Sequence, residues 1–162
     1  MLIFFAVAAM MVVLFVFDSP AVDYRWVAFG GVLPLFEALT LRPLVLHTLL
    51  GSVLLLSVVM AATIGRRLVR RRWLGVPIGT FEFLVVSGVW TRAELFWWPF
   101  AGFDAIAVKP LPEFDRPLVA LVVLELGAVL AAAVLGRRLG FTEPDTRAQF
   151  VRTGRIPKDR TR

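Results

Sequence analysis

The sequence predicts an all-α fold, a polytopic membrane helical bundle with four to five transmembrane segments, one of them short or re-entrant. Of the 162 residues, 59% are apolar, which exceeds the roughly 45–50% usual in soluble domains. The apolar residues gather in long runs, and a helix needs about 20 of them to cross a hydrocarbon core. Two of these runs are separated by five arginines within residues 66–72, which is the charge bias of a cytoplasmic loop.

Each predicted segment follows from an apolar run and its flanks. No basic residue precedes the first run and no small-residue cleavage site follows it, so we expect a retained span rather than a signal peptide. The second run is short and contains Pro34, which predicts either a kinked span or a re-entrant segment. The predicted segments are Met1–Phe17, Trp26–Leu41, Leu44–Gly65, Leu74–Trp90 and Pro117–Gly136.

These segments define two parts of the chain and a topology. Residues 1–138 form the transmembrane helical domain, and residues 139–162 form a basic cytoplasmic tail with a short helix near residues 146–152. The arginines beside the spans predict a multi-pass membrane protein with its C-terminus in the cytoplasm. Arginine outnumbers lysine sixteen to two, which indicates a GC-rich bacterial genome, so the expected location is the bacterial cytoplasmic (inner) membrane. We prefer five spans, which puts the N-terminus outside. The alternative is four spans with a re-entrant segment and the N-terminus inside.

Composition excludes several kinds of site. The chain has no cysteine and a single histidine, His47, so thiolate sites are excluded and a zinc site would have at most one imidazole ligand. The net charge of +6 comes from arginines beside the spans, so we expect no nucleic-acid partner. The expected partners are the lipid bilayer and other membrane proteins.

Four ionisable side chains lie within the apolar segments, where burial is costly and often marks function. Glu37 ends one segment and His47 begins the next, so the short Arg42-Pro43 connection should bring them together as candidate metal ligands. Glu82 is the candidate general base. The alternative is structural hydrogen bonding between helices, and Glu125 is the candidate contact with a partner helix.

Aromatic and basic residues mark the two membrane surfaces. Trp97 and Trp98 belong to a stretch rich in aromatic residues, which favour the membrane–water interface, here on the side away from the cytoplasm. On the cytoplasmic side, basic residues attract anionic lipid by about 1 kcal/mol each. The predicted lipid or partner contacts on that side are Arg66, Arg67, Arg70, Arg71 and Arg72.

Three patches together resemble a family of bacterial inner-membrane metal-dependent hydrolases. The first is Gly31-Val32-Leu33-Pro34-Leu35-Phe36-Glu37, and the second is His47-Thr48-Leu49-Leu50. The third runs from Gly79 to Gly88 and is followed by Trp98-Pro99. The resemblance implies a helical membrane protein with a metal-dependent hydrolase activity.

The chain departs from this pattern at most of the metal-binding positions. Where the resemblance implies Asp, His and Asp, the sequence has Leu35, Phe83 and Ser87. His47 is kept, and Glu82 cannot replace a side chain at residue 83 because neighbouring helix positions point about 100° apart. A catalytic zinc needs three protein ligands and an open position.

Two main functions therefore stay open, beside a third class, a small transporter or proton relay that uses Glu82 and Glu125. The first is a membrane accessory or scaffold protein, a degenerate hydrolase-like pseudoenzyme that serves as a subunit of a protein complex or binds lipid, without a cofactor. The second is a membrane-bound hydrolase acting on a lipid-linked or envelope substrate at the outer face. In that case Glu37 and His47 hold a divalent metal, and Glu82 acts as the base.

Overall fold

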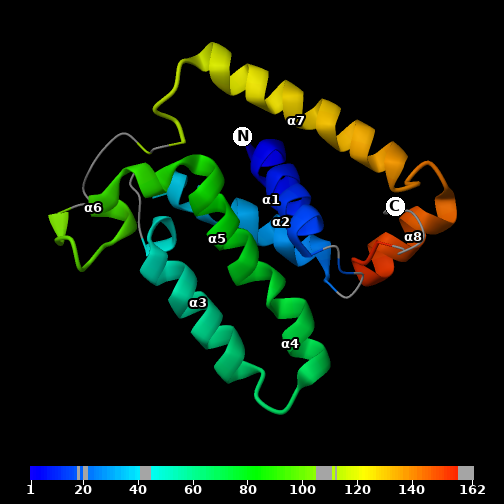
Figure 1. Ribbon diagram of the computed structural model, residues 1–162, viewed down its shortest axis with the longest axis horizontal. Coiled ribbons are helices and arrows are strands. Elements are labelled where there is room, and N and C mark those ends of the chain that lie inside the picture. The colour runs from blue at the N-terminus through cyan, green and yellow to red at the C-terminus, as the bar shows by residue number, and fades with distance from the viewer. Residues whose placement is uncertain (18, 20–21, 41–44, 105–110, 112, 157–162) are drawn as a thin grey trace.

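The computed structural model describes residues 1–17, 19, 22–40, 45–104, 111 and 113–156, and this part of the chain is helical with no strand. The predicted all-α class is confirmed (Figure 1). The Arg42-Pro43 connection and residues 157–162 of the predicted tail lie outside the described residues. The helices, with 3₁₀ helices marked η, are α1 (Leu2–Phe17), α2 (Tyr24–Val32), η1 (Leu33–Thr40), η2 (Val45–His47), α3 (Leu49–Ala62), α4 (Arg67–Trp73), α5 (Gly75–Ser87), η3 (Val89–Thr91), α6 (Ala93–Phe96), α7 (Leu118–Arg138) and α8 (Pro144–Thr153).

Most of these helices are shorter than the apolar runs that predict them. Among the described residues, only α7 is long and apolar enough by length and composition to cross a membrane, and α1 and α3 are apolar but shorter. Helix α3 begins at Leu49 rather than Leu44, because the Thr48 side chain accepts a hydrogen bond from the amide of Gly51 at 3.0 Å and caps the helix.

Glycines let α2 and α5 approach closely at the centre of the bundle. A Cβ atom added at Gly30 would lie 2.1 Å from the carbonyl oxygen of Val76, and one added at Gly79 would lie 2.1 Å from that of Val27. A Cβ atom added at Gly75 would lie 2.9 Å from the Cβ of Trp26. Since Gly75 meets the start of α2 and Gly79 meets its middle, the two helices run side by side in the same direction. Small residues that allow backbones to meet are the usual means of packing helices in membranes.

Pro34 ends the α-helical part of the second segment, as its sequence predicts. Proline has no N–H to donate to the carbonyl of Gly30, four residues earlier, and its ring crowds that turn. The chain continues as the 3₁₀ helix η1. The hydroxyl of Thr80 on α5 lies 3.2 Å from the Gly30 carbonyl oxygen and 3.1 Å from that of Val76. The Gly30 carbonyl also accepts a hydrogen bond from the amide of Leu33.

Helix α7 lies along the outside of the bundle and packs on α1 (Figure 1). Only 6% of its most apolar stretch is buried. The Glu125 carboxylate accepts hydrogen bonds from the amides of Ile3 at 3.0 Å and Phe4 at 3.2 Å, and lies 2.8 Å from the Met1 amine. These amides belong to the first turn of α1 and have no partner within their own helix, so Glu125 fastens α7 to the start of α1.

The tail packs on the opposite end of α1 and α2. The predicted short helix is present as α8, and the carbonyl of Gly154 after it accepts a hydrogen bond from the amide of Tyr24 at 2.9 Å. Arg25 donates to Asp23 and to the carbonyl of Val151, and its hydrogen bond to Asp23 raises the pKa of Arg25. Ile156 is buried, so residues 139–156 pack as part of the bundle.

The close approach of α2 and α5 predicts a position-specific response to a single methyl group. Gly79→Ala should destabilise the protein by about 2 kcal/mol, because backbone atoms must move apart, and lower its apparent melting temperature in detergent by about 5 °C. Gly127→Ala on α7 is the control, because no atom lies within 4 Å of its added Cβ. A melting temperature that falls equally in both variants would contradict the proposed packing.

Candidate functional site

The candidate site is a buried acid–imidazole–acid cluster made by Glu37, His47 and Glu113. It lies where η1, η2 and the segment before α7 meet, at the end of the bundle away from α4 (Figure 1). His47 and Glu113 are completely buried.

Local structure fixes His47 at the start of α3. The Thr48 hydroxyl donates to the carbonyl of Val45 at 2.7 Å, which closes the single turn of η2 against the helix. Gly51 makes room for this turn, since a Cβ atom there would lie 1.9 Å from the Val45 carbonyl oxygen. The imidazole therefore points from a rigid turn and not from the helix itself.

Glu37 holds this turn from the middle of η1. One carboxylate oxygen lies 2.6 Å from Nδ1 of His47, and the other accepts a hydrogen bond from the amide of Leu46 at 2.9 Å. The predicted meeting of Glu37 and His47 is confirmed. The same carboxylate thus binds both the His47 side chain and the backbone of η2.

Glu113 completes the cluster and was missed by sequence reasoning, which placed it in an outer loop. Its Oε1 lies 3.1 Å from Nε2 of His47, and its Oε2 is buried without a hydrogen-bond partner among the described residues. The sequence shows only that this acidic residue lies between Pro112 and Phe114. A loop residue carries no periodicity, so its burial could not be deduced.

The cluster satisfies both nitrogens of the imidazole. A ring nitrogen donates only when it carries hydrogen, and both carry hydrogen only in the imidazolium form. The arrangement therefore suits a positively charged ring between two carboxylates. Removing one partner of such a buried group typically costs about 3–5 kcal/mol, because the other charge remains buried without compensation.

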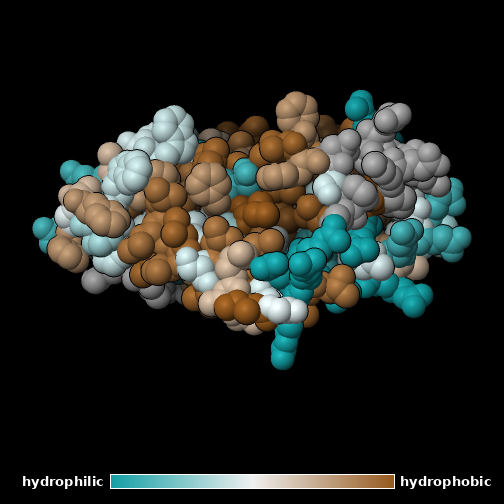
Figure 2. All heavy atoms as spheres, turned by 60° about the horizontal axis from the view of Figure 1, so that its bottom comes forward, coloured by the Kyte–Doolittle hydropathy of each residue, from teal (hydrophilic) through white to brown (hydrophobic). Residues whose placement is uncertain are grey.

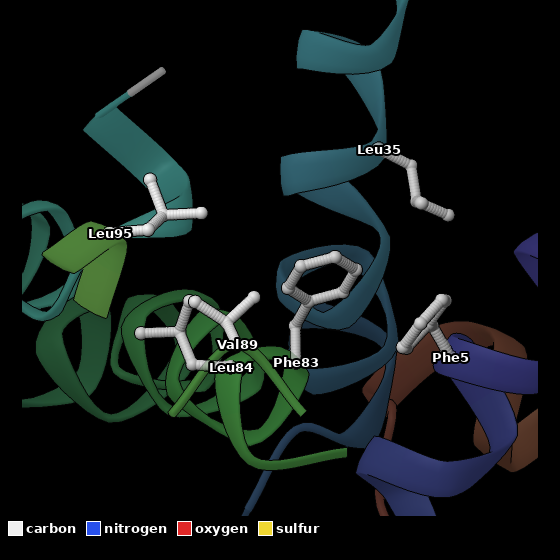
Figure 3. Packing of buried hydrophobic residues seen from close by; sticks show 6 residues of the cluster. All are labelled: Phe5, Leu35, Phe83, Leu84, Val89 and Leu95. Atoms are coloured by element: carbon white, nitrogen blue, oxygen red, sulfur yellow. The ribbon is translucent and has the colours of Figure 1, made fainter. Parts of the chain in front are cut away.

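The positions at which the resemblance implies metal ligands lie in the apolar core instead. Leu35 and Phe83 belong to one buried cluster with Phe5, as Figure 3 shows. The Phe83 ring meets His47 edge to face, with ring centroids 5.4 Å apart. Ser87 is buried, and its hydroxyl bonds the carbonyl of Leu84 in its own helix at 3.4 Å. Of these three side chains, the Phe83 ring is the one that contacts the imidazole, and it offers no ligand atom.

The ring nitrogens of His47 are its metal-binding atoms, and both are engaged. Both nitrogens of His47 already face carboxylate oxygens, on opposite sides of the ring. Within the described ranges, no group of three or more acidic, histidine or cysteine side chains is placed to hold an ion. The site therefore lacks the three convergent ligands and the open position that a catalytic zinc requires.

Glu82 is not brought to this cluster. It precedes Phe83 on α5, and since Phe83 faces His47, Glu82 points about 100° away. Its side chain is half-buried and makes no hydrogen bond or ion pair with a described residue. Its catalytic role stays a prediction.

The predicted lipid and partner contacts lie elsewhere on the molecule. Trp97 and Trp98 line an apolar crevice of about 220 Å³ with Leu49, Leu50 and Val53 of α3. Glu125 is engaged with the first turn of α1, so its predicted contact with a partner helix would have to compete with this bond. The arginines at residues 66–72 surround α4 at the opposite end.

Comparisons with known proteins do not place this chain in a family. No family model, no curated protein and no solved structure matches it.

The cluster predicts a large loss of stability when its centre is removed. His47→Ala should lower the free energy of unfolding by about 3–5 kcal/mol, since it strands two carboxylates, and lower the apparent melting temperature by about 10 °C. Glu82→Gln is the matched control and should change stability by less than about 0.5 kcal/mol.

A milder variant keeps this prediction testable if His47→Ala does not fold. Glu113→Gln retains the shape of the side chain but removes its charge from the imidazole. It should melt below the wild-type protein and above His47→Ala. Equal melting temperatures for Glu113→Gln, Glu82→Gln and the wild-type protein would show that the buried cluster does not stabilise the fold.

Proposed function

We propose that the protein is a multi-pass membrane accessory or scaffold protein, whose bundle binds membrane partners or lipid and performs no metal-dependent hydrolysis. The observation that carries this proposal is the occupation of both His47 nitrogens by carboxylates. The cluster then has a structural role, because its hydrogen bonds hold η1, η2 and the segment before α7 together.

The membrane assignment is supported by where apolar side chains lie. Large hydrophobic side chains are exposed along α1, α3, α5 and α7, among them Phe15, Val58, Val85 and Leu126. Figure 2 shows apolar side chains over a broad part of one face. Soluble monomers rarely expose apolar patches larger than a few hundred Å². We therefore expect this surface to contact lipid or another protein.

The directions of the helices support five passes. Gly31 of α2 lies against Phe5 and Ala9 of α1, so the chain reverses between these helices. Helices α2 and α5 run in the same direction. The chain must therefore reverse twice between them, and α3, which lies between them in the sequence, runs back in the opposite direction. In this proposal, α2 with η1 makes one crossing, and the short α3 and α5 cross a locally thinned bilayer. The arginines of α4 and the tail then lie in the cytoplasm of a bacterial cell, and the candidate site lies outward.

The exposed face of α7 is the proposed contact with membrane partners. Side chains on one side of this helix are exposed, whereas Ala128 is buried against the bundle. Only α1 makes extensive contact with α7 among the described helices. A lipid-facing helix attached at one side leaves the other side free for a second membrane protein.

Site-specific cross-linking tests this contact. A photo-reactive amino acid at Leu126, which is 65% exposed, should give discrete adducts with a membrane protein in intact membranes. The same amino acid at Ala128, which is 6% exposed, is the matched control and should give none. A protein that runs as a lone monomer in mild detergent and forms no adduct at Leu126 would exclude the scaffold function.

Metal analysis tests the hydrolase alternative, which Glu113 favours by adding a third ionisable group beside Glu37 and His47. Because no imidazole nitrogen is open, we expect purified wild-type protein and His47→Ala to contain equally little divalent metal. Stoichiometric metal in the wild-type protein that disappears in His47→Ala would instead establish a metal site.

A further inference from the structure

The turn between α3 and α4, together with α4, carries five arginines within residues 66–72. Arg66, Arg67 and Arg70 make no salt bridge with any described residue. Arg71 and Arg72 are exposed on the same short helix. No acidic residue lies between Glu37 and Glu82 in the sequence, so this charge is available to an external anion.

The same turn forms a hollow. Gly65 adopts a left-handed conformation, with φ of 75°, which reverses the chain after α3. Residues 65–70 line a hollow of about 570 Å³ with three arginines around it. Guanidinium groups donate several hydrogen bonds in a planar fork that matches phosphate oxygens.

Apolar side chains flank the hollow. Ile64 and Leu68 are 77% and 74% exposed. Trp73, at the end of α4, stacks on Trp26 with ring centroids 4.7 Å apart. Tryptophan rings favour the membrane–water interface. Figure 2 shows hydrophilic side chains along the border of the apolar region, on the side where α4 lies in Figure 1.

We propose that this hollow binds the phosphodiester headgroup of an anionic phospholipid of the cytoplasmic leaflet. Arg66, Arg67 and Arg70 bind the phosphate oxygens, and Ile64 and Leu68 contact the upper part of the acyl chains. This inference rests on the proposed membrane function. The exposed apolar flank distinguishes a lipid from free phosphate, which would gain nothing from Ile64 and Leu68.

Lipid titration followed by native mass spectrometry tests the proposal. The full-length protein in non-ionic detergent is titrated with phosphatidylglycerol and, in parallel, with phosphatidylcholine. Phosphatidylglycerol should bind about tenfold more tightly. The triple variant R66Q/R67Q/R70Q should lose this preference, and R66K/R67K/R70K, which keeps the charge but not the planar fork, should lie between the two.

The matched control removes the same charge from another part of the cytoplasmic side. R137Q/R138Q/R152Q changes three exposed arginines outside the hollow and should retain the preference within about twofold. An equal loss in both triple variants would show that net charge alone attracts the lipid. Equal binding of the two lipids by the wild-type protein, or displacement of phosphatidylglycerol by excess inorganic phosphate, would overturn the proposal.

Alkaline carbonate extraction of cell membranes separates this inference from the function on which it rests. Wild-type protein and both triple variants should remain with the membrane pellet. If they do so while the lipid preference is absent, only the headgroup site is wrong. Release of the wild-type protein into the aqueous fraction would overturn the membrane function itself.

Discussion

The close approach of the α2 and α5 backbones is the constraint on which the remaining structure depends. Gly30 and Gly79 bring carbonyl groups and α-carbons of the two helices within contact distance. This spacing lets the Thr80 hydroxyl reach the Gly30 carbonyl, and it fixes the direction in which the chain leaves α2 after Pro34. The path of η1, and with it the position of Glu37, follows from a contact in which glycines of each helix meet the backbone of the other.

The candidate site shows how an apolar bundle can hold three ionisable groups. Each nitrogen of His47 has its own carboxylate, and Glu37 also accepts from the backbone of η2. The Phe83 ring closes one side of the imidazole. Such an arrangement ties together segments that are far apart in the sequence, and it leaves no nitrogen free to bind an ion or to take a proton from water.

Several features could be read from the sequence because they depend on local chemistry. The helical class follows from the apolar runs, the irregular second segment from Pro34, and the contact of Glu37 with His47 from the short connection between them. The start of α3 also had a local signal, since Thr48 before an apolar run is a good N-cap.

Other features depend on contacts that no local pattern reports. Glu113 comes from a segment without periodicity, and its burial depends on where that segment crosses the bundle. The contact of Glu125 depends on the rotation of α7 about its axis, which an almost uniformly apolar helix does not specify. The sequence shows that Leu35 and Phe83 stand where the resemblance implies metal ligands. Only the tertiary structure shows that both side chains pack with Phe5 in one apolar core.

The bond between Glu125 and the start of α1 has a consequence for how the protein is made. The amides of Ile3 and Phe4 receive their acceptor from a residue more than a hundred positions later in the chain. During synthesis, the first turn of α1 therefore cannot receive this acceptor until residue 125 has left the ribosome. Helix α1 can form earlier, but its N-terminal amides gain this carboxylate only when α7 packs on α1.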